Sequence, residues 1–302
     1  MEQLDMDRGR ILRRVGWALF LMVLCTLATQ IILSSLFYRF SPEFYQSEYY
    51  GVVITLLTIM GVSYPVFLSV MRKVPDTKPS QEGASKLSLR QLIGLFFVCV
   101  AFMYLSSFAG SIISLLIAKL KGSEIENPVE EFLGNSNIYL NAIYIAIIGP
   151  AMEELIFRKV LLNKLRRFGD LPAILFTSLA FGLYHLNLSQ FIYATTLGII
   201  FSYTVIRTNT IKYTVILHMI INTIGSVIAP LAIGNEKAMV LLFLWVIISI
   251  VIGMSLFQKN KGGILLLAGD EQVEKKSEYF LHIGTVLYLL SCVAMMVLQI
   301  FN

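Results

Sequence analysis

Residues 138–158 read IYLNAIYIAIIGPAMEELIFR, an apolar run that carries two adjacent glutamates and an arginine. A helix of about 20 apolar residues crosses the hydrocarbon core of a membrane, and this run has that length. Its apolar character continues through Gly149 and Pro150 into the charged residues, so the end of the span is not visible in the sequence. Because a carboxylate inside a membrane costs at least ~2.5 kcal/mol, such a residue indicates a functional site. The run therefore predicts both a membrane fold and the position of its site.

The composition of the rest of the chain agrees with a membrane protein. Of the 302 residues, 57% are hydrophobic and 14% are charged, whereas an average globular chain has about 25% charged residues. So few charged side chains cannot cover the surface of a water-soluble fold. The net charge of +5 does not indicate nucleic-acid binding, because the basic residues are not gathered on one solvent face.

Apolar stretches of spanning length recur along the whole chain and predict nine spans. They cover about residues 15–37, 50–70, 92–118, 138 onward, 171–186, 191–206, 213–229, 238–257 and 279–301. We therefore expect an all-α, polytopic membrane helix bundle of eight to nine transmembrane helices. The linkers are short and no repeat of 20–50 residues is visible, so we expect a single membrane domain, 1–302.

The basic residues concentrate in alternate loops, which predicts the orientation of the bundle. Cytoplasmic loops carry the excess of Lys and Arg in membrane proteins, and 20 of the 24 Lys and Arg residues fall on one side of the predicted spans. This distribution places the N-terminus (1–14) and the loops 71–90 and 258–278 in the cytoplasm, and the C-terminus outside. The predicted localisation is a multi-pass protein of the cell membrane, with the lipid bilayer as its constant partner.

Glu153 and Glu154 are the only acidic residues inside a predicted span, because every other Asp and Glu lies in a loop or at a span end. Glu154 and Arg158 have i,i+4 spacing with the acid first, which favours an ion pair on one helix face. Neighbouring helix positions point about 100° apart, so we expect the two carboxylates to serve different roles and Glu153 to face other groups. Pro150, just before them, frees a backbone carbonyl one turn back in the helix.

Two later spans each carry a histidine at helical spacing from another side chain. Phe181 and His185 share a helix face near the end of one span, and His218 and Asn222 share a face in another. Polar groups in an apolar environment need hydrogen-bond partners. Taken together with Glu153, these residues predict one site built from three helices.

The patterns EExxxR, FxxxH and HxxxN occur in this order on three separate spans. They resemble the three motifs of the intramembrane protease family that includes the type II CAAX prenyl endopeptidases and bacterial bacteriocin-processing or immunity proteins. The resemblance covers about residues 138–230, which would be a CAAX-protease-like catalytic core. It does not extend to the first three or the last two spans.

This resemblance implies a glutamate-dependent endopeptidase in which Glu153 and His185 activate a water molecule. His218 and Asn222 would then stabilise the oxyanion of the tetrahedral intermediate, since an imidazole N–H and an amide are suitable donors in a site with little water. Structural support would come from Glu154, Arg158 and Phe181.

The same residues allow a second chemistry, because Glu153, His185 and His218 could form a Glu/His/His zinc site. The sequence has no HExxH motif, although zinc ligands can also come from separate helices. We expect a mechanism without a cofactor, with zinc as the alternative.

Two other functional classes remain open at this stage. Buried Glu, His and Asn could relay protons in a transporter, although no inverted repeat is visible. A protease-like scaffold could instead bind partner proteins without cutting them. The expected partners are a membrane protein or peptide substrate and, as an open option, a regulatory membrane partner, with no nucleic acid. The basic loops favour a bacterial protein that matures peptides, provides self-protection or regulates the envelope.

Overall fold

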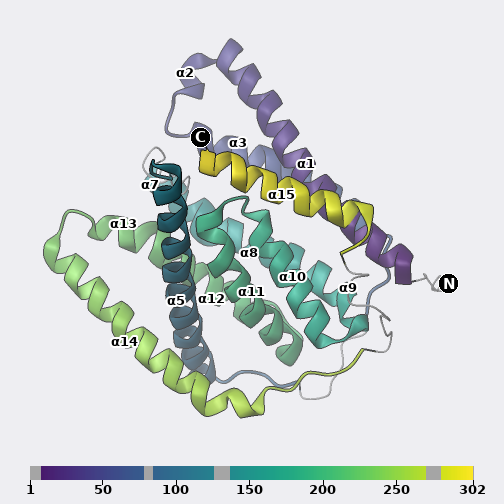
Figure 1. The fold of residues 1–302 in the computed structure, drawn as a ribbon, viewed down its shortest axis with the longest axis vertical. Coiled ribbons are helices and arrows are strands. Elements are labelled where there is room, and N and C mark those ends of the chain that lie inside the picture. The colour runs from purple at the N-terminus through teal and green to yellow at the C-terminus, as the bar shows by residue number, and fades with distance from the viewer. Residues whose placement is uncertain (1–7, 78–83, 126–136, 270–279, 302) are drawn as a thin grey trace.

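A computed structural model of the protein describes residues 8–77, 84–125, 137–269 and 280–301. Within these residues all regular structure is helical, which confirms the predicted all-α bundle (Figure 1). Of the predicted cytoplasmic regions, residues 1–7, 78–83 and 270–278 lie outside the described part of the chain.

Eight helices in the described residues are long and apolar enough to cross a membrane, as expected for a multi-pass membrane protein. Three of them are single helices of the first and last thirds: α1 (Arg8–Phe40), α5 (Leu89–Lys121) and α15 (Ile283–Phe301). Two more are α11 (Leu188–Thr208) and α14 (Glu236–Asn260), the latter followed by the 3-10 turn η6 (Lys261–Gly263).

The other three spanning helices are composite. The second span joins α3 (Tyr50–Thr55), the π-helix η1 (Leu56–Ser63) and α4 (Tyr64–Met71), after the short α2 (Pro42–Tyr45). The fourth joins α7 (Ile138–Ile143), η2 (Tyr144–Ile148), α8 (Gly149–Glu153), η3 (Glu154–Leu162), α9 (Asn163–Leu165) and η4 (Arg166–Phe168). The third composite span joins α12 (Lys212–Thr223), η5 (Ile224–Ile228) and α13 (Ala229–Ala232).

One of the nine expected spans, at 171–186, is not among these eight helices. It is the shorter helix α10 (Asp170–Tyr184) of 15 residues. At 1.5 Å per residue it is about 22 Å long, less than the ~30 Å hydrocarbon core. The helix ends here because Leu186 adopts a positive φ of 56°. The chain then turns directly into α11, whose first turn is capped by Asn187.

Helices α10 and α11 pack closely because small residues lie between them. A Cβ added at Gly182 would lie 2.0 Å from the Thr195 hydroxyl, and one added at Gly198 would lie 2.9 Å from Ser178. Small residues allow close approach of helices in a membrane. This contact positions the end of α10, where His185 lies.

Three of the four π-helices among the described residues precede a proline, which explains them from the sequence. The segments η1, η2 and η5 each end two residues before Pro65, Pro150 or Pro230. In each, the residue before the proline donates its N–H to the carbonyl five positions back, the π-helical bond. Proline cannot donate the next bond, and local π adjustments are a known response to proline inside membrane helices.

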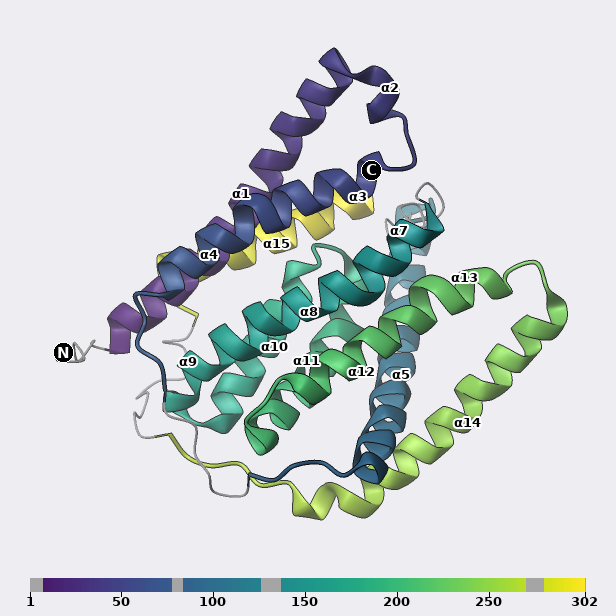
Figure 2. The same cartoon turned by 180° about the vertical axis from the view of Figure 1, so that it is seen from behind.

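The helices form two groups around a central set made of α8, α10, α11 and α12. On one side lie α1, α3, α4 and α15, and on the other lie α5 and α14 (Figures 1 and 2). A Cβ added at Gly16 in α1 would lie 2.4 Å from the Thr285 hydroxyl of α15, so this pair packs without side chains between the backbones.

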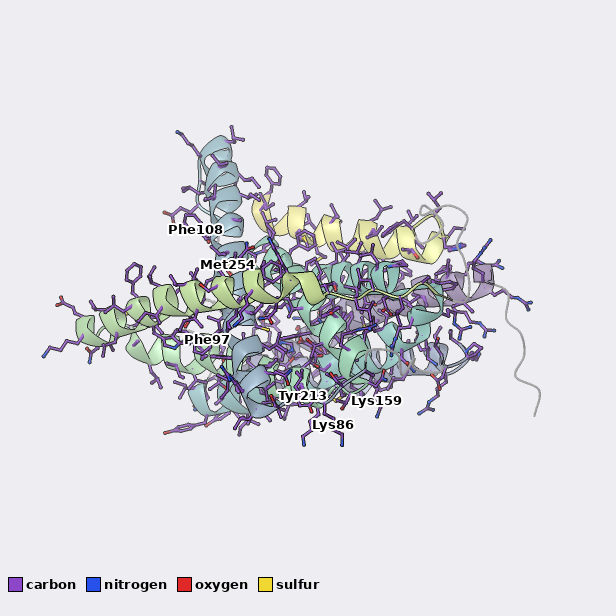
Figure 3. The ribbon with its side chains drawn as sticks, turned by 90° about the horizontal axis from the view of Figure 1, so that it is seen from below. Lys86, Phe97, Phe108, Lys159, Tyr213 and Met254 are labelled. Atoms are coloured by element: carbon purple, nitrogen blue, oxygen red, sulfur yellow. The ribbon has the colours of Figure 1, made fainter. Side chains whose placement is uncertain are left out.

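The predicted cytoplasmic ends come together at one end of the molecule. Figure 3 shows Lys86, Lys159 and Tyr213 along one edge of the molecule, and the Tyr213 hydroxyl donates to the Leu87 carbonyl at 3.4 Å. Lys164 is buried here and donates to the Val74 carbonyl at 2.6 Å. Some basic residues at this end, such as Lys164, therefore form hydrogen bonds between a helix and a loop and are not simply solvated.

Candidate active site

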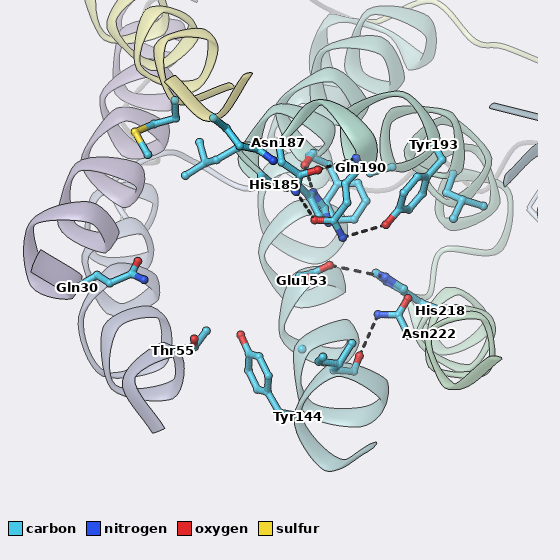
Figure 4. Close-up of a pocket in the computed structure, with 18 of the residues that line it drawn as sticks. Gln30, Thr55, Tyr144, Glu153, His185, Asn187, Gln190, Tyr193, His218 and Asn222 are labelled. Atoms are coloured by element: carbon cyan, nitrogen blue, oxygen red, sulfur yellow. Dashed lines mark hydrogen bonds and ion pairs between the residues drawn. The ribbon is translucent and has the colours of Figure 1, made fainter. Parts of the chain in front are cut away.

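A cavity of about 750 Å³ lies between the central helices and the α1, α3 and α15 group (Figure 4). Its wall includes one residue or more from each of the three motifs: Glu153, Phe181, His185, His218 and Asn222. The three spans that carry the motifs therefore converge on one cavity, as the spacing of the motifs predicts.

Glu153 and Glu154 both contact the imidazole of His218. The Nδ1 of His218 lies 3.2 Å from Glu154 Oε1, and its Nε2 lies 3.7 Å from Glu153 Oε2. His218 is 5% exposed and the Glu154 side chain is fully buried, whereas the Glu153 side chain is 20% exposed and lines the cavity. Since a carboxylate can only accept, His218 Nδ1 donates to Glu154.

As expected, Glu154 pairs with Arg158 while Glu153 lines the cavity, but the contact of both carboxylates with one imidazole was not predicted. The prediction assumed the 100° step of an α-helix, and Glu154 is the first residue of the π-helix η3. A π-helix has i→i+5 hydrogen bonds and more residues per turn, so neighbouring side chains point in closer directions. One imidazole can then lie between both carboxylates.

Arg158 forms the expected ion pair with Glu154, with 3.2 Å between Nη1 and Oε1 and no exposure of either side chain. Its guanidinium lies 4.0 Å from the centre of the Phe181 ring and 5.7 Å from that of Phe201. Phe181 thus stacks on a cation, a favourable contact when both groups are desolvated. The pair fixes Glu154, and through Glu154 it fixes His218.

His185 ends α10 and its ring is held by its own helix. Nδ1 lies 2.9 Å from the Phe181 carbonyl, and since a carbonyl can only accept, Nδ1 carries the hydrogen. In the neutral ring, Nε2 then holds a lone pair. The Phe181 ring contacts both histidines, with centroid distances of 4.9 Å to His185 and 6.0 Å to His218.

Asn222 is held by the carbonyl that Pro150 leaves free. In the π-helix η2, Gly149 donates to the Tyr144 carbonyl, and the next donor in the series would be residue 150. Because Pro150 has no N–H, the Ile145 carbonyl lacks its helical partner, and Asn222 Nδ2 donates to it at 2.9 Å. The third motif is thus bonded to the helix of the first, and a second amide hydrogen of Asn222 remains.

A chain of polar side chains beside His185 was not predicted from the sequence. Asn187 is nearly buried; its amide donates to the His185 carbonyl at 3.1 Å and to Gln190 Oε1 at 2.6 Å. Gln190 Nε2 in turn donates to the Tyr193 hydroxyl at 2.9 Å. Asn187 also accepts from the Gln190 N–H, as an N-cap does. The pattern Asn-x-x-Gln resembles a capping box and could have revealed this cap.

The cavity also includes residues from spans outside 138–230. Gln30 of α1, Thr55 of α3 and Gln299 of α15 line it opposite the motif residues, and Figure 4 shows Gln30 and Thr55 across the cavity from Glu153. The motifs could not predict this wall, since they cover only the central spans.

The candidate zinc ligands do not form a metal site in this structure. Within residues 8–77, 84–125, 137–269 and 280–301, no group of three His, Cys, Asp or Glu side chains could hold a metal ion. Glu153 and His218 are neighbours, but His185 does not complete a set with them. We derive no step through a metal.

Comparison with known proteins agrees with this geometry. Residues 135–224 match the family model of the type II CAAX prenyl endopeptidases, described as Rce1-like, and this stretch contains all three motifs. The chain is also 28% identical over 161 residues to "Putative membrane peptidase YdiL" of Bacillus subtilis (strain 168). That alignment covers 52% of this chain and 64% of the relative. No solved structure matches.

Proposed function

With the resemblance to the type II CAAX prenyl endopeptidases confirmed over residues 135–224, we propose that this protein is an intramembrane endopeptidase that cleaves a membrane-associated protein or peptide. The observation that carries the proposal is the environment of Glu153. Its carboxylate faces the cavity, its Oε2 makes no hydrogen bond with any described residue, and His218 Nε2 is 3.7 Å away.

In this proposal Glu153 and His185 activate a water molecule in the cavity. The water oxygen attacks the carbonyl carbon of the substrate, and Glu153 takes one of the water protons. His185 can accept a hydrogen bond from the same water through Nε2, because its Nδ1 hydrogen points to Phe181. As the C–N bond breaks, the proton passes to the leaving amine.

His218 and Asn222 would stabilise the oxyanion that forms in the attack. Asn222 has one amide hydrogen left after its bond to Ile145. His218 would need a hydrogen on Nε2 in addition to the one that Nδ1 donates to Glu154. Removal of a single oxyanion donor typically costs about 100- to 1,000-fold in rate, so each of these groups has a measurable share.

Replacement of the carboxylate tests the proposal. We expect Glu153→Gln to lower cleavage by at least ~100-fold, the usual share of general acid–base catalysis, and the uncut substrate to accumulate. The measurement is a comparison of membrane peptides and proteins from cells with the wild-type chain, the variant, and no chain. Glu236→Gln makes the same change at an exposed carboxylate in the first turn of α14 and serves as the control.

If Glu153→Gln and His185→Ala both behave as wild type while removal of the chain does not, the scaffold function replaces the protease. Metal dependence has its own measurement. The metal content of the purified protein is determined with and without a chelator, and full cleavage by metal-free protein excludes a zinc mechanism.

A further inference from the structure

The wall of the cavity opposite Glu153 carries carboxamides from two helices outside the motif region. Gln30 and Gln299 line the cavity together with Thr55 and Tyr144. Gln30 lies within the long apolar helix α1, and Gln299 lies two residues before the end of α15. A carboxamide is costly where it faces hydrocarbon, so its place in the wall of a cavity calls for an explanation.

Gln30 of α1 and Gln299 of α15 follow the contact between these two helices by the same number of residues. Gly16 of α1 contacts Thr285 of α15, and each glutamine follows its contact residue by fourteen positions. At 1.5 Å per residue both lie about 21 Å further along. Their shared lining of one cavity shows that both side chains face the same space.

This polar wall lies on the side of Glu153 away from the basic end. Tyr144 precedes Glu153 by nine residues in a helix that ends at Phe168, beside the basic loops. Gln30 lies in the half of α1 that is remote from its basic start at Arg8. The cavity therefore extends from Glu153 toward the ends that the charge distribution places outside the cell.

The chemistry of the lining indicates an uncharged ligand. Of the residues that line the cavity, Glu153 is the only Asp, Glu, Lys or Arg in the described part of the chain. A phosphate headgroup would call for basic side chains, and none lines this space. A glutamine carboxamide has both donors and an acceptor, and these can pair with the two kinds of group that alternate along a peptide backbone.

A segment that is cut inside a membrane must first become extended, which exposes its backbone N–H and C=O groups. Each such group left without a partner in hydrocarbon costs several kcal/mol. We propose that Gln30 and Gln299 form a subsite that binds the backbone of an uncharged, unwound peptide segment and guides it to Glu153 from the end of the cavity away from the basic face. This inference rests on the proposed function and specifies its substrate class.

Peptide binding to the full-length Glu153→Gln protein in nanodiscs tests the subsite without turnover. The probes are two fluorescent 20-residue Leu/Ala peptides, one with a central Gly-Pro that unwinds the helix and one without it. We expect the Gly-Pro peptide to bind more tightly. The double variant Gln30→Leu/Gln299→Leu should weaken its binding about 30-fold, the combined effect of two ordinary hydrogen bonds.

Two further variants separate this effect from altered folding. Ser35→Leu introduces the same side chain on α1 at an exposed position and should leave binding unchanged. The double variant Gln30→Asn/Gln299→Asn keeps the carboxamides and should retain most of the affinity. Unchanged binding of the Gly-Pro peptide in the double Leu variant overturns the subsite, as does equal binding of both peptides. Neither outcome affects the protease proposal, which stands or falls with cleavage by the wild-type and Glu153→Gln chains.

Discussion

Two carboxylate–guanidinium pairs are buried in the described part of the chain, and they differ in what surrounds them. Asp170 at the start of α10 pairs with Arg207 in the last turn of α11, at the basic end of the molecule. The distance between Oδ2 and Nη2 is 2.5 Å. Glu154 and Arg158 lie one turn apart in the helix of the first motif, 3.2 Å from each other. Both pairs are largely or wholly shielded from solvent.

The Asp170 pair is completed by backbone groups. Leu267 donates its N–H to Asp170 Oδ2 at 2.9 Å, and its carbonyl accepts the Asp170 N–H at 3.0 Å. The pair thereby fastens the segment after α14 to the start of α10. Its position beside the loops lets the Arg207 side chain reach water if the pair is broken.

The Glu154 pair is less complete. Although Nη1 of Arg158 is within ion-pair distance of Glu154, none of its three side-chain nitrogens makes a well-aligned hydrogen bond with a described residue. The guanidinium rests instead on the Phe181 ring, and Glu154 also holds His218. A buried pair of this kind is weak evidence for stability, because desolvation can exceed the Coulombic gain. Its position against three motif residues indicates a role in the site.

The largest effect that we expect comes from breaking the Glu154 pair. Arg158→Met leaves a carboxylate without a counter-charge in a fully buried place, which should lower the free energy of unfolding by about 3–5 kcal/mol. The measurement is denaturant unfolding in detergent. Arg158→Met combined with Glu154→Gln should recover most of this loss, since the charge is then absent. A double variant as unstable as the single one would contradict the explanation.

Asn222→Ala should have the next largest effect, because it leaves the Ile145 carbonyl without a partner. We expect a loss of about 1–3 kcal/mol in the free energy of unfolding. Pro150→Ala is the matched background: residue 150 then has an N–H that can reach Ile145, so the cost of Asn222→Ala should shrink there. An equal cost in both backgrounds would show that the two positions are not linked.

Asp170→Asn should cost less, about 1 kcal/mol, because the amide oxygen can still accept from Leu267 and Arg207 can turn to water. Cleavage should persist at the wild-type level. Thermal unfolding and the membrane-peptide comparison measure the two quantities. If Asp170→Asn abolished cleavage without unfolding the protein, the contrast between the two pairs would be wrong.

The smallest perturbation tests which end of the molecule faces the cytoplasm, the basic end with the Asp170 pair or the opposite end. In a chain with its three native cysteines replaced by Ala, the variant Gln30→Cys should react with a membrane-impermeant maleimide added to intact cells. The variant Ser85→Cys changes a residue whose N–H donates to the Arg207 carbonyl, and it should react only after permeabilisation. The opposite pattern would reverse the orientation predicted from the basic loops.

The sequence was sufficient for the central part of the fold and for the convergence of the motifs. Apolar length predicts the spans, and i,i+4 spacing correctly predicts the Glu154–Arg158 pair. The apolar stretch at 171–186 was predicted to be a span, and the helix α10 found there has only 15 residues. The positive φ of Leu186, which follows the end of this helix, is not indicated by the sequence pattern.

Two parts of the site required tertiary information or the helix type. The contact of both carboxylates with His218 depends on a π-helix that periodicity does not indicate. Gln30 and Gln299 are ordinary polar residues within apolar runs, and their shared place in the cavity wall follows from the packing of α1 against α15. Asn187, by contrast, stands before a helix with Gln190 three positions on, a pattern that can be recognised from sequence.

The geometry of the site depends on Pro150, a residue that has no reactive group. Because it withholds one backbone hydrogen, the place of Asn222 relative to Glu153 is set by a gap in the main chain of the neighbouring helix. A substitution at Pro150 could therefore alter catalysis while every motif side chain remains present. A search that compares only motif letters would classify such a chain as an intact enzyme, so the proline belongs in any definition of this site.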